Sequence, residues 1–180
     1  MILASVTATG RGATDRLLSD VVSRLTQDGL RVLGALRAAD AFAAPGACDC
    51  DLWLLPDGPL ARITQDLGAG SQACRMDAGA MQQAVGLASA RLERHGADLV
   101  VLNKFGQAEA EGRGFRPLIA EAVAQGIPVL IGLSDTHRAA FGLFAGPMAE
   151  ALPPQADAVL AWCRQATQRA GAARPGETAA

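Results

Sequence analysis

The sequence has few of the residues that build metal sites. Among its 180 residues are four cysteines and two histidines, His95 and His137. Cys48 and Cys50 lie close together, but structural zinc sites usually have two residues between paired cysteines and need a second pair of ligands. We therefore expect no metal site.

The chain also lacks an excess of positive charge and any long apolar segment. Its net charge of -2 at pH 7 gives no reason to expect a nucleic-acid or membrane partner. No apolar run reaches the roughly 20 residues of a membrane-spanning helix. The N-terminus lacks the basic region and apolar core of a signal peptide. We expect a cytoplasmic protein without membrane insertion, whose cysteines are reduced.

Apolar residues, by contrast, are abundant. They make up 50% of the sequence, largely through alanine, which suits closely packed helices. A chain of this length can bury a substantial core without disulfides. We expect residues 1–170 to form a single domain. Residues 171–180 are small and polar and include a proline, so we expect a disordered tail there.

Strand and helix patterns alternate along the chain, which is typical of a three-layer α/β domain with a mainly parallel sheet. Buried strands are predicted at 1–6, 30–36, 99–102 and 128–132, and helices at 14–28, 77–95, 118–125, around Phe141 and Phe144, and at 157–169. Two further apolar runs flank the turn sequence at 56–59, which predicts a β-hairpin inserted between the two halves of the sheet. The segment 146–154, with glycine and prolines, is interpreted as a connection.

The most informative stretch begins at the predicted buried strand Leu99–Leu102. Charged residues and glycines follow it directly, among them Lys104, Glu109, Glu111 and Arg113. Ligands of open α/β sheets bind outside the carboxyl ends of the strands, so this loop is where a site is expected. The alternative is a solvated loop in which Lys104 pairs with Glu109 or Glu111.

A glycine-containing turn between the first strand and the first helix gives a second candidate. Strand, glycine turn and helix form the context of a phosphate-binding loop, but this turn has no lysine, and Asp15 would repel phosphate. An ordinary turn, with Thr14 or Asp15 capping the helix, is the alternative. Because helix N-termini attract anions without any motif, weak anion binding remains compatible with this sequence. The candidate ligand-binding residues here are Gly10, Arg11, Gly12 and Thr14.

Three segments carry a resemblance to a known family. NKFGQAEAEGRGF at 103–115, TQDLGAGSQACRMD at 64–77 and GIPVLIGL at 126–133 resemble a bacterial domain-of-unknown-function family, over roughly residues 1–165. Members of that family are often encoded near molybdate-transport genes and are sometimes labelled nucleotide-binding. The resemblance implies a nucleotide or a molybdate-like oxyanion as the ligand.

A fainter resemblance is to small P-loop nucleoside triphosphatases. In those proteins the equivalent strand ends in an Asp-Glu pair, followed by Ile-Gly and a later glutamate. Here Asn103 and Lys104 take the places of the acidic pair, Gly106 matches the glycine, and Glu109 matches the later glutamate. The resemblance implies a P-loop scaffold with degenerate Walker motifs. With magnesium-holding carboxylates replaced by an amide and an ammonium group, we expect an anion to bind where a metal would be repelled.

Two arginines could add to such a site. Gly68, Gly70 and Ser71 make a flexible loop whose backbone amides could surround an oxyanion, and Arg75 could close it with a bidentate contact. Arg113, between two glycines, is a candidate anion clamp.

Three hypotheses follow for the function. The favoured one is a non-hydrolytic protein that binds a small anion, accessory to molybdate transport or metabolism, and it needs neither a catalytic residue nor a metal. The second is a slow nucleoside triphosphatase with Glu109 or Glu111 as the base. The third is an interaction protein, such as a homodimer, that binds no ligand. The residues predicted to bind the anion are Gly10, Arg11, Gly12, Thr14, Arg75, Asn103, Lys104 and Arg113.

Overall fold

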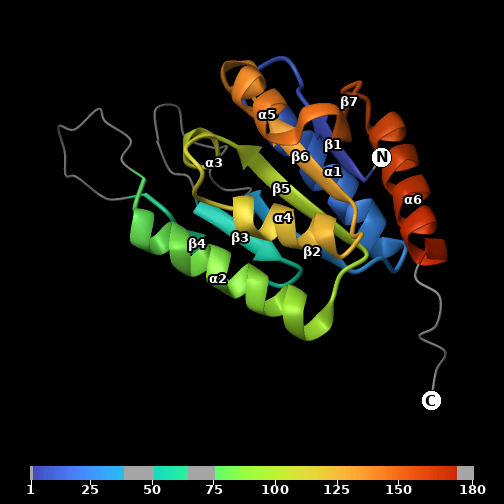
Figure 1. Cartoon of the computed structure of the whole chain (residues 1–180), viewed down its shortest axis with the longest axis horizontal. Coiled ribbons are helices and arrows are strands. Elements are labelled where there is room, and N and C mark those ends of the chain that lie inside the picture. The colour runs from blue at the N-terminus through green and yellow to red at the C-terminus, as the bar shows by residue number, and fades with distance from the viewer. Residues whose placement is uncertain (1, 39–50, 65–75, 174–180) are drawn as a thin grey trace.

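The computed structural model describes residues 2–38, 51–64 and 76–173 (Figure 1). Within these ranges a seven-stranded sheet has the order β4-β3-β2-β5-β6-β1-β7. The strands are β1 Leu3–Val6, β2 Val32–Arg37, β3 Asp51–Leu55, β4 Leu60–Arg62, β5 Leu99–Phe105, β6 Val129–Leu133 and β7 Ala149–Leu152. The α-helices are α1 Ala13–Gln27, α2 Ala78–His95, α3 Gln107–Ala110, α4 Arg116–Ala124, α5 Arg138–Ala145 and α6 Ala156–Ala173. Two 3-10 turns, η2 Asp135–His137 and η3 Gly146–Met148, flank α5.

Five neighbouring strands, β2, β5, β6, β1 and β7, run parallel, which confirms the predicted mainly parallel α/β sheet. The predicted hairpin also forms: β3 pairs antiparallel with β2, and β4 pairs antiparallel with β3. Its place differs from the prediction, because it lies at one edge of the sheet and not between the two halves. The hairpin therefore extends the sheet beyond β2.

Strand β5 lies at the centre of the packing. Leu99 and Val101 contribute to a core shared with α1 and α6, while Val100 and Leu102 contribute to a core shared with α2, α4 and α5. All four side chains are at most 2% exposed. Alternate residues of a strand point to opposite faces, so the unbroken apolar run reflects burial on both sides. The helices accordingly form the outer two of three layers (Figure 1).

The helix starts follow two different rules. Asp77 caps α2, as predicted: its side chain accepts a hydrogen bond from the Ala80 amide at 3.0 Å. In α1 the expected cap by Thr14 or Asp15 is wrong, because the N-cap residue is Gly12, two or three residues earlier, and the helix has no side-chain cap. Gly12 has a φ of 69°, a left-handed conformation that suits glycine.

Two corrections concern the C-terminal third. The segment 146–154, expected to be a connection, contains β7, which pairs in parallel with β1. Its sequence Ala-Glu-Ala-Leu has weak strand propensity, which an edge position tolerates. Helix α6 runs on to Ala173, past the expected end at Arg169, so the first three residues of the expected tail are helical.

In the ranges that the structure describes, no helix has the length and apolar character needed to cross a membrane.

Candidate functional site

Two adjoining cavities lie at the carboxyl edge of the parallel strands. The first, here called the first-turn cavity, has a volume of about 380 Å³ and lies between the turn after β1 and the start of η2. The second, the apolar cavity, has a volume of about 290 Å³ and lies between the end of β5, α3, the hairpin and the start of α2. Asp15, Arg37 and Lys104 line both, so the two cavities share one wall.

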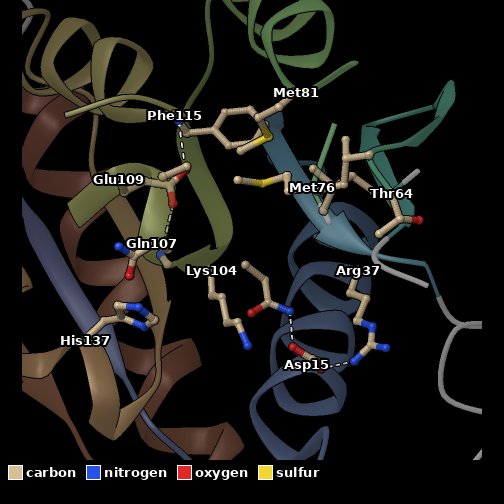
Figure 2. A pocket seen from close by; sticks show the side chains of 15 residues that line it. Asp15, Arg37, Thr64, Met76, Met81, Lys104, Gln107, Glu109, Phe115 and His137 are labelled. Atoms are coloured by element: carbon tan, nitrogen blue, oxygen red, sulfur yellow. Dashed lines mark hydrogen bonds and ion pairs between the residues drawn. The ribbon is translucent and has the colours of Figure 1, made fainter. Parts of the chain in front are cut away.

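Lys104 is the central residue of this shared wall. It is exposed, whereas its neighbours Asn103 and Phe105 on β5 are 7% and 1% exposed. Figure 2 shows its side chain extending into the space between Asp15 and His137. No carboxylate of the described residues forms an ion pair with Lys104, so the alternative of a pair with Glu109 or Glu111 is not what the structure contains. Lys104 is also the single lysine of the sequence.

Asp15 and Arg37 form a charged pair that sequence reasoning did not foresee. The Asp15 carboxylate accepts a hydrogen bond from Asn103 Nδ2 and lies 3.6 Å from Arg37 Nη1 (Figure 2). This ties α1 to the ends of β5 and β2. The carboxylate that would repel phosphate therefore has a guanidinium beside it. The position of Arg37 at the carboxyl end of a strand can be recognised in the sequence. The sequence does not show that this strand, β2, lies next to β5.

Asn103 connects β5 to α1 at the edge of the site. Its amide nitrogen is engaged by Asp15, and its buried Oδ1 has no hydrogen-bond donor among the described residues. A Cβ at Gly132 on β6 would lie 2.7 Å from that oxygen. Asn103 thus fills the narrow space between β6 and α1, as well as lining the apolar cavity.

The glycine turn brings all four of its predicted residues, Gly10, Arg11, Gly12 and Thr14, to the first-turn cavity. The Thr14 hydroxyl oxygen accepts a hydrogen bond from the Ala8 amide at 2.9 Å and so closes the turn. Gly10 and Gly12 have φ angles of 106° and 69°. The N-terminus of α1, with the positive end of the helix dipole, lies at this cavity, and no side chain caps it.

The EAEGRG segment is built around a buried carboxylate. Glu109 is 3% exposed, and its two oxygens accept hydrogen bonds from the amides of Gly106 and Phe115, each at 2.9 Å. Gly114 has a φ of 59°, and a Cβ there would lie 2.0 Å from Glu109 Oε1. The motif therefore encodes a loop that wraps closely around Glu109.

Glu111 and Arg113 lie on the outer side of the same loop. The Arg113 guanidinium pairs with the Glu111 carboxylate, to which the Gln107 amide also donates. Hydrogen bonds from Gln107 and then Arg113 lower the pKa of Glu111 below its usual value. Neither Glu111 nor Arg113 lines the two cavities. The predicted site residue Arg75 lies outside the described residues, as do the glycine loop at 68–71 and Cys48, Cys50 and Cys74.

The apolar cavity is the part that sequence reasoning missed. Its walls come from β3, the end of the hairpin, α2 and the loop after α3, and His137 of η2 faces it from the other side (Figure 2). Ser134 Oγ and His137 Nδ1 are 3.0 Å apart. In the part of the chain that the structure describes, no group of three His, Cys, Asp or Glu side chains is arranged to hold a metal ion.

The fold, a mainly parallel sheet with a glycine turn between β1 and α1, is that of a known nucleoside triphosphatase. The solved structure of a human cancer-related nucleoside triphosphatase is similar over 96% of this chain and 98% of its own, with a TM-score of 0.58 and 16% identity. The chain itself belongs to the family described as "Protein of unknown function (DUF2478)", which matches residues 3–162. The family that the NKFG and EAEGRG motifs imply is thereby confirmed, and so is the separate, fainter resemblance of the fold to a nucleoside triphosphatase.

One further relative is longer than this chain. The molybdenum import ATP-binding protein ModC 2 of Bradyrhizobium diazoefficiens is 33% identical over 156 residues. The match covers 86% of this chain but 17% of that protein.

Proposed function

We propose that this chain binds a small anion, a nucleotide phosphate or a molybdate-like oxyanion, in the first-turn cavity without hydrolysing it. The observation that carries the proposal is Lys104, whose ammonium group stands beside the glycine turn with no acidic partner among the described residues. In a P-loop the lysine that contacts the phosphates stands at the start of the helix that follows the loop. Here Lys104 of β5 lines the first-turn cavity from another element.

The other charges around the first-turn cavity support an anionic ligand. Arg11 and the uncapped N-terminus of α1 add positive potential. The two carboxylates that line the cavity are both paired, Asp15 with Arg37 and Asp135 with Arg138 at 2.7 Å. A bound anion would therefore be the natural counter-ion of Lys104.

The contacts of the acidic residues support the proposed lack of hydrolysis. Magnesium-dependent hydrolysis needs carboxylates that hold the metal and orient water. Both oxygens of Glu109 are engaged by backbone amides, and Glu111 is held by Gln107 and Arg113 outside the cavities. These contacts favour a binding protein over the slow triphosphatase.

We further propose that the chain has a role in molybdenum import. The relative named as a molybdenum import ATP-binding protein makes ATP-like nucleotides and molybdate the first ligands to test. On this basis we propose a cytoplasmic accessory role. Arg75 stays a predicted ligand contact, and a homodimer stays an alternative that ligand binding does not require.

A thermal-shift series tests the proposal. The purified chain is heated with ATP, GTP, molybdate, tungstate, sulfate or phosphate, with and without magnesium. We expect at least one anion to raise the melting temperature in a concentration-dependent way, because a ligand that binds only the native state stabilises it. The pure interaction hypothesis predicts no shift with any anion.

Lys104 variants make the test specific. Lys104→Ala should abolish the anion-dependent shift, and Lys104→Arg should keep part of it. Arg113→Ala is the matched control, because it removes the same charge from the nearby loop outside both cavities. A shift that survives in Lys104→Ala contradicts the proposal. Phosphate release that needs magnesium and disappears in Glu109→Gln would instead establish the triphosphatase.

A further inference from the structure

The apolar cavity is walled by side chains of the protein core. Leu52, Ile63, Met81 and Phe115 are each at most 7% exposed, and all belong to the core that α2 and α4 cover. Met76, 40% exposed, stands at the rim. A water molecule in such a hollow needs two to four polar neighbours, and this wall supplies none. This wall of the cavity is therefore suited to apolar surface from a ligand.

Polar groups face this wall from the opposite side. Figure 2 shows Met81, Met76 and Phe115 gathered at one end, with Lys104 and Asp15 at the other. Since Lys104 lines both cavities, one molecule can place a charged group beside the glycine turn and an uncharged group against the methionines. Ligand pockets commonly combine an apolar lining with a few polar groups that fix orientation.

We infer that the ligand is an organic phosphate with a planar heteroaromatic group, the chemical class of the nucleotides, whose ring lies in the apolar cavity while a phosphate contacts Lys104. A bare tetrahedral oxyanion, one central atom with four oxygens, has no surface to bury against Met81 or Phe115. A planar ring does, and both methionine sulfur and the phenyl ring make favourable contacts with aromatic groups.

Hydrogen-bonding groups at the cavity can recognise the edge of such a ring. Thr64 lies beside Met76 at the rim, and Gln107 lies at the start of α3, where its amide reaches Glu111. This inference rests on the proposed function, because it takes Lys104 as the phosphate contact. It goes further by choosing the nucleotide class over molybdate.

Methionine methyl NMR tests the position of the ring. The chain has four methionines, of which Met76 and Met81 line the apolar cavity while Met148 is exposed elsewhere, next to α5. With 13C-methyl methionine in the full chain, saturating adenosine or guanosine phosphates should shift the Met76 and Met81 signals through the ring current and leave Met148 unchanged. Tripolyphosphate and molybdate should shift neither cavity signal in this way. Methionine-to-leucine variants assign the signals.

Affinities complete the test. Nucleotides should bind at least about tenfold more tightly than tripolyphosphate, and Met76→Ala should weaken nucleotide binding about three- to tenfold while leaving tripolyphosphate unchanged. Leu143→Ala, which removes a 91% exposed leucine from α5, is the control.

The outcomes separate the two proposals. If inorganic anions bind as tightly as nucleotides, or nucleotides bind without moving the Met76 and Met81 signals, the nucleotide inference is overturned and anion binding stands. If neither nucleotides nor inorganic anions bind, both proposals fail together.

Discussion

Glu109 is a charged residue that the fold has turned inward. Its carboxylate accepts two backbone amides, from Gly106 on one side and Phe115 on the other, and so joins the end of β5 to the start of α4. Hydrogen bonds to charged groups are stronger than those between neutral groups. Glu109 therefore fixes the loop that follows β5. Lys104 lies two residues before Gly106, where this loop begins.

We predict that Glu109→Ala lowers the free energy of unfolding by about 2 to 5 kcal/mol, because it leaves the buried Phe115 amide and the partly buried Gly106 amide without acceptors. Glu109→Gln, which keeps one acceptor oxygen, should lose less. Urea unfolding measures both. Glu93→Ala, at an exposed position of α2, should stay within about 0.5 kcal/mol of the wild type. Equal stability of Glu109→Ala and wild type would contradict the structural role.

Cys163 shows the opposite case, a reactive group made inert by its surroundings. It is fully buried on α6, and burial raises the pKa of its thiol to about 12. At pH 8 the native thiol is therefore protonated and should not react with a disulfide reagent. A chain in which the other three cysteines are replaced by serine should show no reactive thiol when native and one in guanidinium chloride.

The same pKa shift gives a pH dependence. Because the folded pKa of the Cys163 thiol lies above its ordinary value of 9.0, the unfolded chain loses its proton first as pH rises. This contribution to stability is complete below pH 9 and declines between about pH 9 and 12. Urea unfolding of wild type and Cys163→Ala over that range should show a shallower decline in the variant. Identical slopes would contradict the shift.

At the scale of elements, the loop between β5 and α4 depends on its glycines. Gly114→Ala should destabilise the protein by about 2 kcal/mol or more, because a side chain there is both strained by its φ and in collision with Glu109. Gly86 offers a matched control within α2, since nothing lies within 4 Å of an added Cβ. Gly86→Ala should stabilise by up to about 1 kcal/mol. Thermal and urea unfolding compare the two, and losses of equal size would contradict this account of the loop.

Asp15 links α1 to the strands β2 and β5, and a substitution there gives a further prediction. Asp15→Asn removes a negative charge beside Lys104, so it should raise anion affinity, by about three- to tenfold, where Lys104→Ala lowers it. Calorimetric titration with one anion compares them. Asp20→Asn, which changes an exposed ion pair with Arg24 on the same helix, should have no effect. Weaker binding in Asp15→Asn would show that Asp15 itself holds the ligand.

Elements with clear signals could be predicted from the sequence, and those without could not. The apolar run at 99–102, the turn at 56–59 and the Asp77 cap each left a local pattern, and each element formed, although β5 runs on to Phe105 and the hairpin lies at the sheet edge. Strand β7 left none, because alanine and glutamate are poor strand formers and only pairing with β1 makes this segment extended. The secondary structure of β7 is therefore determined by its tertiary contacts and not by its local sequence.

The proposed site is assembled from segments that lie far apart in the sequence. The turn after β1, the start of α2 and the loop after β5 all border the two cavities. Ligand binding should therefore slow amide hydrogen exchange in residues 8–16, 76–84 and 103–115 together, with α6 unaffected after correction for global stabilisation. Protection confined to one segment would contradict a site that all three form.

The same convergence explains which site residues the sequence revealed. Lys104 and Gly10 carry local signals, a charge that follows the apolar run 99–102 and a glycine before a helix, although Lys104 proves to lie within β5 and not in the loop after it. Arg37 and Met81 look like an ordinary strand end and a core position. They become part of the site only through the order of the strands, which places β2 and the hairpin next to β5.

The two-sided packing of β5 has one more consequence. Leu102 belongs to one core, Asn103 reaches toward α1, and Lys104 meets the cavities, all within one strand whose register with β6 shifts between Asn103 and Phe105. Because helices cover both faces of β5, inserting or deleting a single residue would move its side chains to the opposite core and turn the ammonium group of Lys104 away from the cavities. A change in the length of β5 should therefore disturb the protein more than a substitution, because the core contacts and the position of Lys104 depend on the same register.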